Sequence, residues 1–310
     1  MLSAFKIAAS VVAGLTVLTL AGPIIGETIA TFPPLYPKAS PSLIAALGLP
    51  YEDVIFPTTD DLLLRGWFVP AERPDAPAIL YAPATAHDQR SGLSLVLAFH
   101  RAGYHVLLFS YRGHALSDGR KGDFTYGDAE SEDVDAAVRF LYEEKGVRQI
   151  GAIGHSVGAA SAILSAARNL RLGAVVAVAP FNGVAEVWHT SRPSLVPRFI
   201  LDWTLWASER LKGFDREEIR PLHVVERIAP RPLLVIHGTE DQRITEDQVR
   251  QLFDAAENPK TLWLVEGATH GSIRTPVLDE LVPEVIAFFD AAWENPAALA
   301  RSHDMPAVAL

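Results

Sequence analysis

Ser156 is the centre of a Gly-His-Ser-Val-Gly sequence that spans residues 154–158. The apolar stretch Gln149–Ile153 precedes it and predicts a strand, and the small residues that begin at Ala159 predict a helix after it. A serine in a tight turn between a strand and a helix is typical of a nucleophile elbow, whose glycines let neighbouring elements approach closely. We therefore predict that Ser156 is a nucleophile, against the alternative of an incidental turn. The N–H of Val157, at the start of the helix, would then face a developing oxyanion.

A serine hydroxyl needs a general base, and the base needs an acid that orients it. After an elbow of this kind the acid comes next in the chain and the histidine comes last. His270 lies in the loop after the last predicted strand, so we predict that it is the base. Asp241 follows another predicted strand and is preferred as the acid over its neighbour Glu240, which we expect to be solvated or ion-paired. The remaining histidines after the serine, interpreted as structural, are His189, His223 and His237.

These side chains must be positioned by a sheet. From about Tyr51 onward, short apolar runs alternate with segments of helical length. The predicted strands are Asp53–Phe56 and Leu62–Val69, which form a hairpin, and Ala78–Ala82, His105–Ser110, Gln149–Ile153, Ala174–Val178, Pro232–Ile236 and Thr261–Val265. The predicted helices are Gly92–Ala102, Gly127–Glu144, Val157–Leu170, Glu246–Ala256 and Val277–Trp293. Near-continuous apolar runs fit strands buried on both faces, so the expected fold class is α/β, with a mostly parallel sheet and helices on both faces.

Residues 181–229 are too many for a single connection, and they carry helical patterns of their own. We predict that they form a small helical cap, inserted before the acid-bearing strand. The cap's large apolar residues are Trp188, Phe199, Ile200, Trp203, Leu205 and Trp206. We interpret them first as packing between the cap and the main domain. The alternatives are a wall that binds an acyl group and a face that rests on a bilayer.

An acidic run follows Gly127 on a predicted helix. Its members are Asp128, Glu130, Glu132, Asp133 and Asp135. Their spacing scatters them around the helix axis, which argues against convergence on a metal ion. We therefore predict that they form a solvated face.

The composition excludes several classes of protein. A hydrophobic fraction of 49% is too high for a disordered chain. The formal net charge of −10 argues against a protein that binds nucleic acid through its phosphates. The chain has no Cys, which removes disulfides, a thiolate nucleophile, a Cys-ligated metal site and a lipid-modified cysteine.

The first fifty residues differ from the rest, because Lys6, Glu27 and Lys38 are their only charged side chains. The segment Ile7–Gly26 is uncharged, and twenty helical residues span about 30 Å, the thickness of a hydrocarbon core. We interpret residues 1–30 as a membrane anchor, with the catalytic domain on the extracytoplasmic side. The alternatives are a cleaved signal peptide, which would give a secreted or periplasmic protein, and a buried N-terminal helix. The expected organisation continues with a proline-rich spacer over 31–50, a catalytic domain over 51–295 and a C-terminal tail over 296–310.

Several motifs in a consistent order give the chain, from about Tyr51 to Trp293, a resemblance to the α/β-hydrolase fold. The matching stretches are Leu64–Pro70, Ala102–Phe109, Tyr111–Gly113, Gly154–Gly158, Arg231–Gly238 and Gly267–Gly271. The chain looks most like the small-cap serine hydrolases of the BEM46 or ABHD13/ABHD17-like group. Members of that group often carry an N-terminal membrane segment.

The sequence departs from the family pattern after the third predicted strand. The family usually has His-Gly there, whereas this chain has Ala82, Pro83 and Ala84. Proline has no N–H, so the Ala84 N–H is the expected second oxyanion donor, with Thr85 as the alternative.

The resulting expectation is a serine hydrolase that cleaves an acyl ester or thioester through Ser156, Asp241 and His270, with an acyl-enzyme intermediate. A small-molecule or lipid ester is the expected substrate, no metal or organic cofactor is implied, and the oligomeric state is not predicted. The alternatives are a peptidase or amidase that uses the same triad and a non-catalytic binding protein with a hydrolase fold.

Overall fold

The computed structural model describes residues 21–22, 25, 40–191, 196–294 and 299. Within them an eight-stranded sheet has the order β1-β2-β4-β3-β5-β6-β7-β8. The strands are β1 Glu52–Pro57, β2 Leu63–Val69, β3 Ala78–Ala82, β4 His105–Ser110, β5 Ile150–His155, β6 Leu172–Val178, β7 Leu233–Gly238 and β8 Lys260–Val265. Strand β2 is antiparallel to both β1 and β4, and all the other pairings are parallel. The predicted hairpin and the mostly parallel sheet are therefore confirmed.

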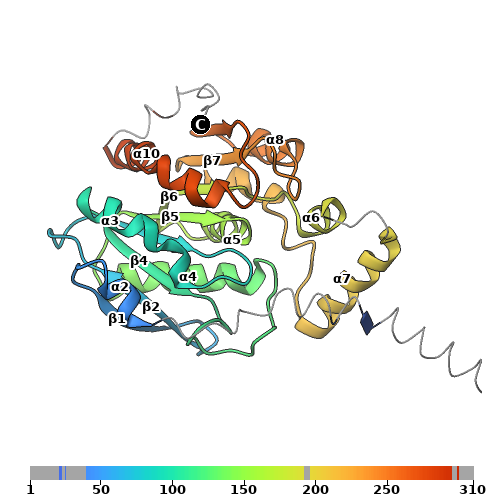
Figure 1. Ribbon diagram of the computed structural model, residues 1–310, viewed down its shortest axis with the longest axis horizontal. Helices are drawn as coiled ribbons and strands as arrows, with labels where there is room; N and C mark the ends of the chain where they lie inside the picture. Colours follow the sequence, from blue (N-terminus) through green and yellow to red (C-terminus); the bar gives the residue numbers. More distant parts are fainter. Residues whose placement is uncertain (1–20, 23–24, 26–39, 192–195, 295–298, 300–310) are drawn as a thin grey trace, which may run out of the picture.

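Helices cover both faces of this sheet, as predicted (Figure 1). The longer ones are α3 Leu93–Arg101, α4 Asp128–Glu143, α5 Val157–Ala166, α6 Val184–Thr190, α7 Arg198–Lys212, α8 Glu246–Ala255 and α10 Val282–Glu294. The shorter helical segments are α2 Pro41–Ala45, η1 Gln89–Gly92, η2 Pro221–His223, η3 Val225–Ile228, η4 Ile273–Val277 and α9 Leu278–Glu280. Apolar residues of α4, α5 and α8 share one buried cluster, and those of α3 and α10 share another. Alternate residues of strands β2 to β8 enter the two clusters, as for Leu80 and Ile79 of β3, whereas β1 contributes to one cluster only.

Two predicted helix ranges are wrong at their ends. The helix predicted over Val157–Leu170 stops at Ala166, and beyond it the N–H of Arg168 makes a tighter bond, to the carbonyl three residues earlier at Ser165. The helix predicted over Val277–Trp293 is interrupted at Leu281, between α9 and α10. Pro283 follows two residues later, and a proline lacks the N–H that a continuous helix would use.

The connection from β6 to β7 forms a helical cap with α6 and α7. Helix α7 lies at the right of Figure 1, at the edge of the molecule. Leu205 is buried, as core packing requires, but Phe199 is 68% exposed and Trp206 is 45% exposed. The prediction that the large apolar residues pack between cap and main domain is therefore wrong for Phe199 and Trp206. The rings of Trp203 and Trp206 instead stack on each other, with their centroids 5.0 Å apart.

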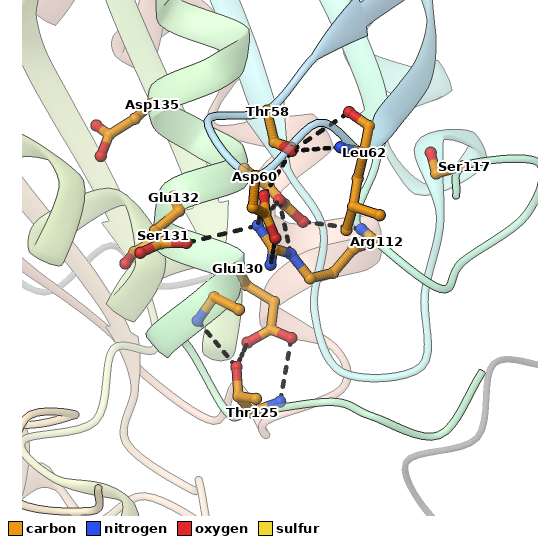
Figure 2. A network of polar contacts seen from close by, with 12 residues as sticks. Thr58, Asp60, Leu62, Arg112, Ser117, Thr125, Glu130, Ser131, Glu132 and Asp135 are labelled. Atoms are coloured by element: carbon orange, nitrogen blue, oxygen red, sulfur yellow. Dashed lines mark hydrogen bonds and ion pairs between the residues drawn. The ribbon is translucent and has the colours of Figure 1, made fainter. Parts of the chain in front are cut away.

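The prediction of a solvated acidic face on α4 is wrong for Glu130 and Asp133, which are fully buried. The Glu130 carboxylate accepts the N–H of Thr125 (Figure 2). It also accepts the N–H of Gly127, and so satisfies donors at the start of the helix. Asp133 accepts hydrogen bonds of 2.8 Å from the backbone N–H of Arg112 and 2.9 Å from its Nε. These two carboxylates are buried because each has strong donors within reach.

Arg112 also bonds to Asp60, at 3.0 Å from Nη1, in the turn between β1 and β2 (Figure 2). One guanidinium group therefore joins three segments, namely the turn of the hairpin, the loop that follows β4 and the helix α4. Such charge-assisted bonds are among the stronger polar contacts in proteins.

The expected anchor over residues 7–26 falls almost entirely outside the described part of the chain. Among the described residues, no helix has the length and apolar character needed to span a membrane.

Candidate active site

Ser156 lies at the turn between β5 and α5, with φ 56° and ψ −116°. A left-handed φ is unfavourable for a residue other than glycine, so the surrounding structure must hold it in place. The two glycines explain how. A Cβ atom on Gly154 would collide with the backbone of Gly158, and one on Gly158 would collide with the carbonyl oxygen of Ala82. The strand-to-helix turn is thus closed by backbone packed directly against backbone.

The structure brings the three residues of the expected triad together. The Nε2 atom of His270 lies 3.2 Å from the Ser156 hydroxyl oxygen. Its Nδ1 atom lies 2.6 Å from Oδ2 of Asp241. A base that contacts the nucleophile on one side and a carboxylate on the other is arranged for proton abstraction from the serine.

Asp241 is held on both of its oxygens. Oδ2 bonds to His270, and Oδ1 accepts the backbone N–H groups of Arg243 at 2.8 Å and Ile244 at 3.0 Å. Burial by itself raises the pKa of this carboxyl, but the hydrogen bonds from His270 and the two N–H groups outweigh burial and leave the pKa below its usual value. Asp241 is therefore charged at neutral pH. Its neighbour Glu240 is exposed, as expected.

The loop that carries His270 follows β8 and is fastened to the loop that carries Asp241. The N–H of Glu240 bonds to the Ala268 carbonyl, and the N–H of Gly267 bonds to the Thr239 hydroxyl, both at 3.0 Å. Gly267 has φ 72°, a conformation that suits glycine in a tight turn. The acid and the base thus come from two loops that are hydrogen-bonded to each other, at the carboxyl ends of the neighbouring strands β7 and β8.

The two expected oxyanion donors lie on segments that touch. Val157 is the first residue of α5, and the contact between Gly158 and Ala82 places the start of this helix against the end of β3, where Ala84 follows. Both Val157 and Ala84 are buried. Within the described residues, neither backbone N–H has a hydrogen-bond partner.

His155 is a residue of this site that sequence reasoning missed. It occupies the variable position just before Ser156, and its Nε2 lies 3.2 Å from the carbonyl oxygen of His270. The only signal in the sequence was its place inside the elbow motif. Of the three histidines interpreted as structural, His189 pairs with Asp202 at 3.0 Å, His223 is exposed and His237 is buried at the end of β7.

Comparison with known proteins gives a consistent result. Residues 85–224 match the family model described as serine aminopeptidase, S33. An uncharacterized protein of Mycobacterium tuberculosis is 31% identical over 241 residues, which cover 76% of this chain and 78% of that protein. The esterase Pf2001 of Pyrococcus furiosus has the same fold, with a TM-score of 0.67 at 22% identity, over 84% of this chain and 98% of that one.

The chain belongs to the α/β-hydrolase family. Within this family it is also similar to the polyketide transferase ATR5 of Stachybotrys chlorohalonatus, at 25% identity over 71% of this chain and 89% of that protein. The proteins similar to this α/β-hydrolase thus include one named an esterase and one named a polyketide transferase. The family membership leaves the substrate open.

Proposed function

We propose that the protein is a serine hydrolase that cleaves acyl esters or thioesters, with Ser156, His270 and Asp241 as its catalytic triad. The observation that carries the proposal is the continuous contact from the serine hydroxyl through the imidazole to the charged carboxylate, at 3.2 Å and 2.6 Å. The esterase fold of the Pyrococcus furiosus protein supports the same reaction class. The small cap between β6 and β7 supports placement in the small-cap group.

In the first half of the reaction, Oγ of Ser156 attacks the carbonyl carbon of the substrate while Nε2 of His270 takes the hydroxyl proton. Asp241 stabilises the imidazolium that forms. The carbonyl oxygen becomes an oxyanion and accepts hydrogen bonds from the N–H groups of Val157 and Ala84. Collapse of this intermediate breaks the bond to the leaving alcohol or thiol, which receives its proton from His270.

In the second half, water attacks the acyl-enzyme. His270 removes a proton from the water, a second oxyanion forms at the same donors, and its collapse releases the carboxylic acid. The proton returns from His270 to Oγ of Ser156, which restores the starting state. The chain's own residues thus supply every proton transfer.

The test is covalent labelling by a fluorophosphonate probe together with hydrolysis of p-nitrophenyl esters of graded chain length. Wild-type protein should be labelled and should turn over at least part of the series. S156A should lose both properties, whereas S94A, at an exposed serine of α3, should keep them. Labelling of S156A at the wild-type rate would refute the nucleophile assignment, and the ester series identifies the preferred acyl length.

The name of the matching family model favours a second candidate, a peptidase. The model covers Ser156 but ends before Asp241 and His270. An amide has a poorer leaving group than an ester, so the same triad must protonate the amine as it departs. Parallel assays of aminoacyl p-nitroanilides and p-nitrophenyl esters distinguish the two, because a peptidase would cleave the anilides at rates comparable with the esters.

The relatives named polyketide transferases raise the question of what attacks the acyl-enzyme. A hydrolase uses water and a transferase uses another nucleophile, although both form the same intermediate. Adding alcohols to the ester assay measures this partition. A hydrolase should continue to release free acid, whereas a transferase should divert most of the acyl group to the alcohol.

Membrane attachment through residues 7–26, with the catalytic domain on the extracytoplasmic side, is part of this proposal. It is supported by the uncharged twenty-residue stretch after Lys6. Fractionation of cells that express the chain with and without residues 1–30 tests attachment. A mature N-terminus downstream of this segment would favour the alternative, a cleaved signal.

A further inference from the structure

The imidazole of His155 lies against the base of the proposed triad. His155 is the last residue of β5 and is only 4% exposed. Its ring centroid is 5.0 Å from that of His270, and its Nε2 atom is 3.2 Å from the His270 carbonyl oxygen. It therefore contacts both the side chain and the backbone of the residue that must reach the serine.

Other hydrogen bonds fasten the His270 loop, but at different residues. Glu240 holds the Ala268 carbonyl, Thr239 holds the Gly267 N–H, and the Ile273 N–H bonds to the Thr269 carbonyl. Among the described residues, the bond from His155 is the only one made to the backbone of His270. It joins the central strand, which ends at the nucleophile, to the loop that carries the base.

The surroundings of His155 favour its neutral form. Burial, with a further contribution from His270, holds the pKa of His155 well below its usual value. Arg274 and His87 also disfavour a positive charge there, and the hydrogen bond to the His270 carbonyl, which favours the protonated ring, does not outweigh them. The Nδ1 atom is buried with no partner among the described residues, so a proton on it would have no acceptor. Neutral His155 with its proton on Nε2 satisfies the contact with the His270 carbonyl.

We propose that His155 is a positioning residue for the general base. It donates its Nε2–H to the His270 carbonyl and packs its ring against the His270 imidazole, and it thereby fixes the distance between that imidazole and Ser156. This inference rests on the proposed function, because it takes His270 as the base. A displacement of about 1 Å in a catalytic group lowers the rate by about 100-fold, so a contact of this kind has a measurable effect.

Two substitutions separate the hydrogen bond from the ring. H155F keeps an aromatic ring against His270 but removes the donor, and H155Q keeps a donor but removes the ring. With the best p-nitrophenyl ester, H155F should lower kcat by about 10-fold to about 100-fold and leave KM within about 2-fold, because substrate binding does not depend on the position of the base. H155Q should recover most of that loss. The acid limb of the kcat/KM profile should keep its midpoint in H155F, because His155 does not titrate there.

A measurement on the wild-type protein makes the test independent of how the variants fold. Nitrogen-detected NMR of the imidazoles should show His155 as a neutral ring protonated on Nε2 at both neutral and mildly acidic pH. A charged His155, a ring protonated on Nδ1, or a folded H155F with wild-type kcat would each overturn the inference. These results differ from a failure of the proposed function, in which wild-type protein itself would neither turn over esters nor react with the fluorophosphonate probe.

Discussion

The substitution of Asp241 by Asn tests the proposed chemistry most sharply, because it changes one atom and little volume. The carboxylate accepts three hydrogen bonds, two from backbone N–H groups on Oδ1 and one from His270 on Oδ2. An asparagine has a single acceptor oxygen and so cannot satisfy all three. It must either keep the two backbone bonds or keep the bond to His270.

The magnitudes decide between these arrangements. Turning the amide nitrogen toward the backbone N–H groups would lose two buried hydrogen bonds, at about 1–3 kcal/mol each. Turning the amide nitrogen toward His270 costs less, because the imidazole can carry its proton on Nε2 instead of Nδ1. The unprotonated Nδ1 then accepts a hydrogen bond from the amide N–H. That tautomer presents an N–H, rather than a lone pair, to Ser156 at 3.2 Å. A base held in the wrong tautomer lowers kcat by about 10⁴, or about 5 kcal/mol in the barrier.

We therefore expect folded D241N to hydrolyse p-nitrophenyl esters about 10⁴-fold more slowly than wild type, with KM little changed. The matched control is E240Q, which removes the neighbouring but exposed carboxylate and should retain wild-type turnover. The reasoning fails if D241N keeps its kcat within about 10-fold of wild type, or if E240Q loses as much activity as D241N does.

Three further expectations concern stability. G158A should destabilise the fold by about 1–3 kcal/mol or more, since its Cβ would meet backbone, whereas G271A has open space and should unfold near the wild-type midpoint in urea. R112M should cost about 3–5 kcal/mol because it removes the counter-charge of the buried Asp133 carboxylate, whereas R120M, at a largely exposed pair, should change the unfolding free energy by less than about 1 kcal/mol. Because the pKa of Asp241 is lowered in the folded state, its stabilising contribution is present above the unfolded value of about 3.9 and is lost as pH falls through the folded value. Acid titration of the unfolding free energy should therefore show a shallower loss in D241N than in wild type, and equal slopes would contradict this.

Where local pattern decides the structure, the sequence was sufficient. Strands β3 and β4 have the predicted bounds. A strand that is buried on both faces is a near-continuous apolar run, so its bounds can be predicted from where that run begins and ends. The positions of Ser156, Asp241 and His270 followed from the elbow motif and from loops at the ends of predicted strands. Each of these inferences used neighbours in the sequence.

Three of the failures involve contacts, or missing contacts, with parts of the chain that are far away in the sequence. Asp133 was expected on a solvated face because the spacing of the acidic run scatters its members around the helix axis, and its partner Arg112 lies 21 residues earlier. His155 was overlooked because its partner is a backbone carbonyl 115 residues away. Every residue has such a carbonyl, so the residue types in a sequence cannot identify the acceptor. Phe199 and Trp206 look like core residues by type alone, since hydrophobic periodicity does not show whether another element will cover them.

The backbone contact between Gly158 and Ala82 limits which parts of this hydrolase could vary when a new substrate preference evolves. It locks the nucleophile turn to the segment that leads to Ala84, so any shift of one would have to carry the other along. The part of the site that makes and breaks bonds is in this sense a single rigid piece. Helix α7, by contrast, sits at the edge of the molecule (Figure 1). Its large apolar side chains Phe199 and Trp206 are exposed to solvent. New substrate ranges should therefore arise by exchange of the cap, and a chimaera that carries the cap of a relative should keep its triad chemistry while its acyl preference follows the donor.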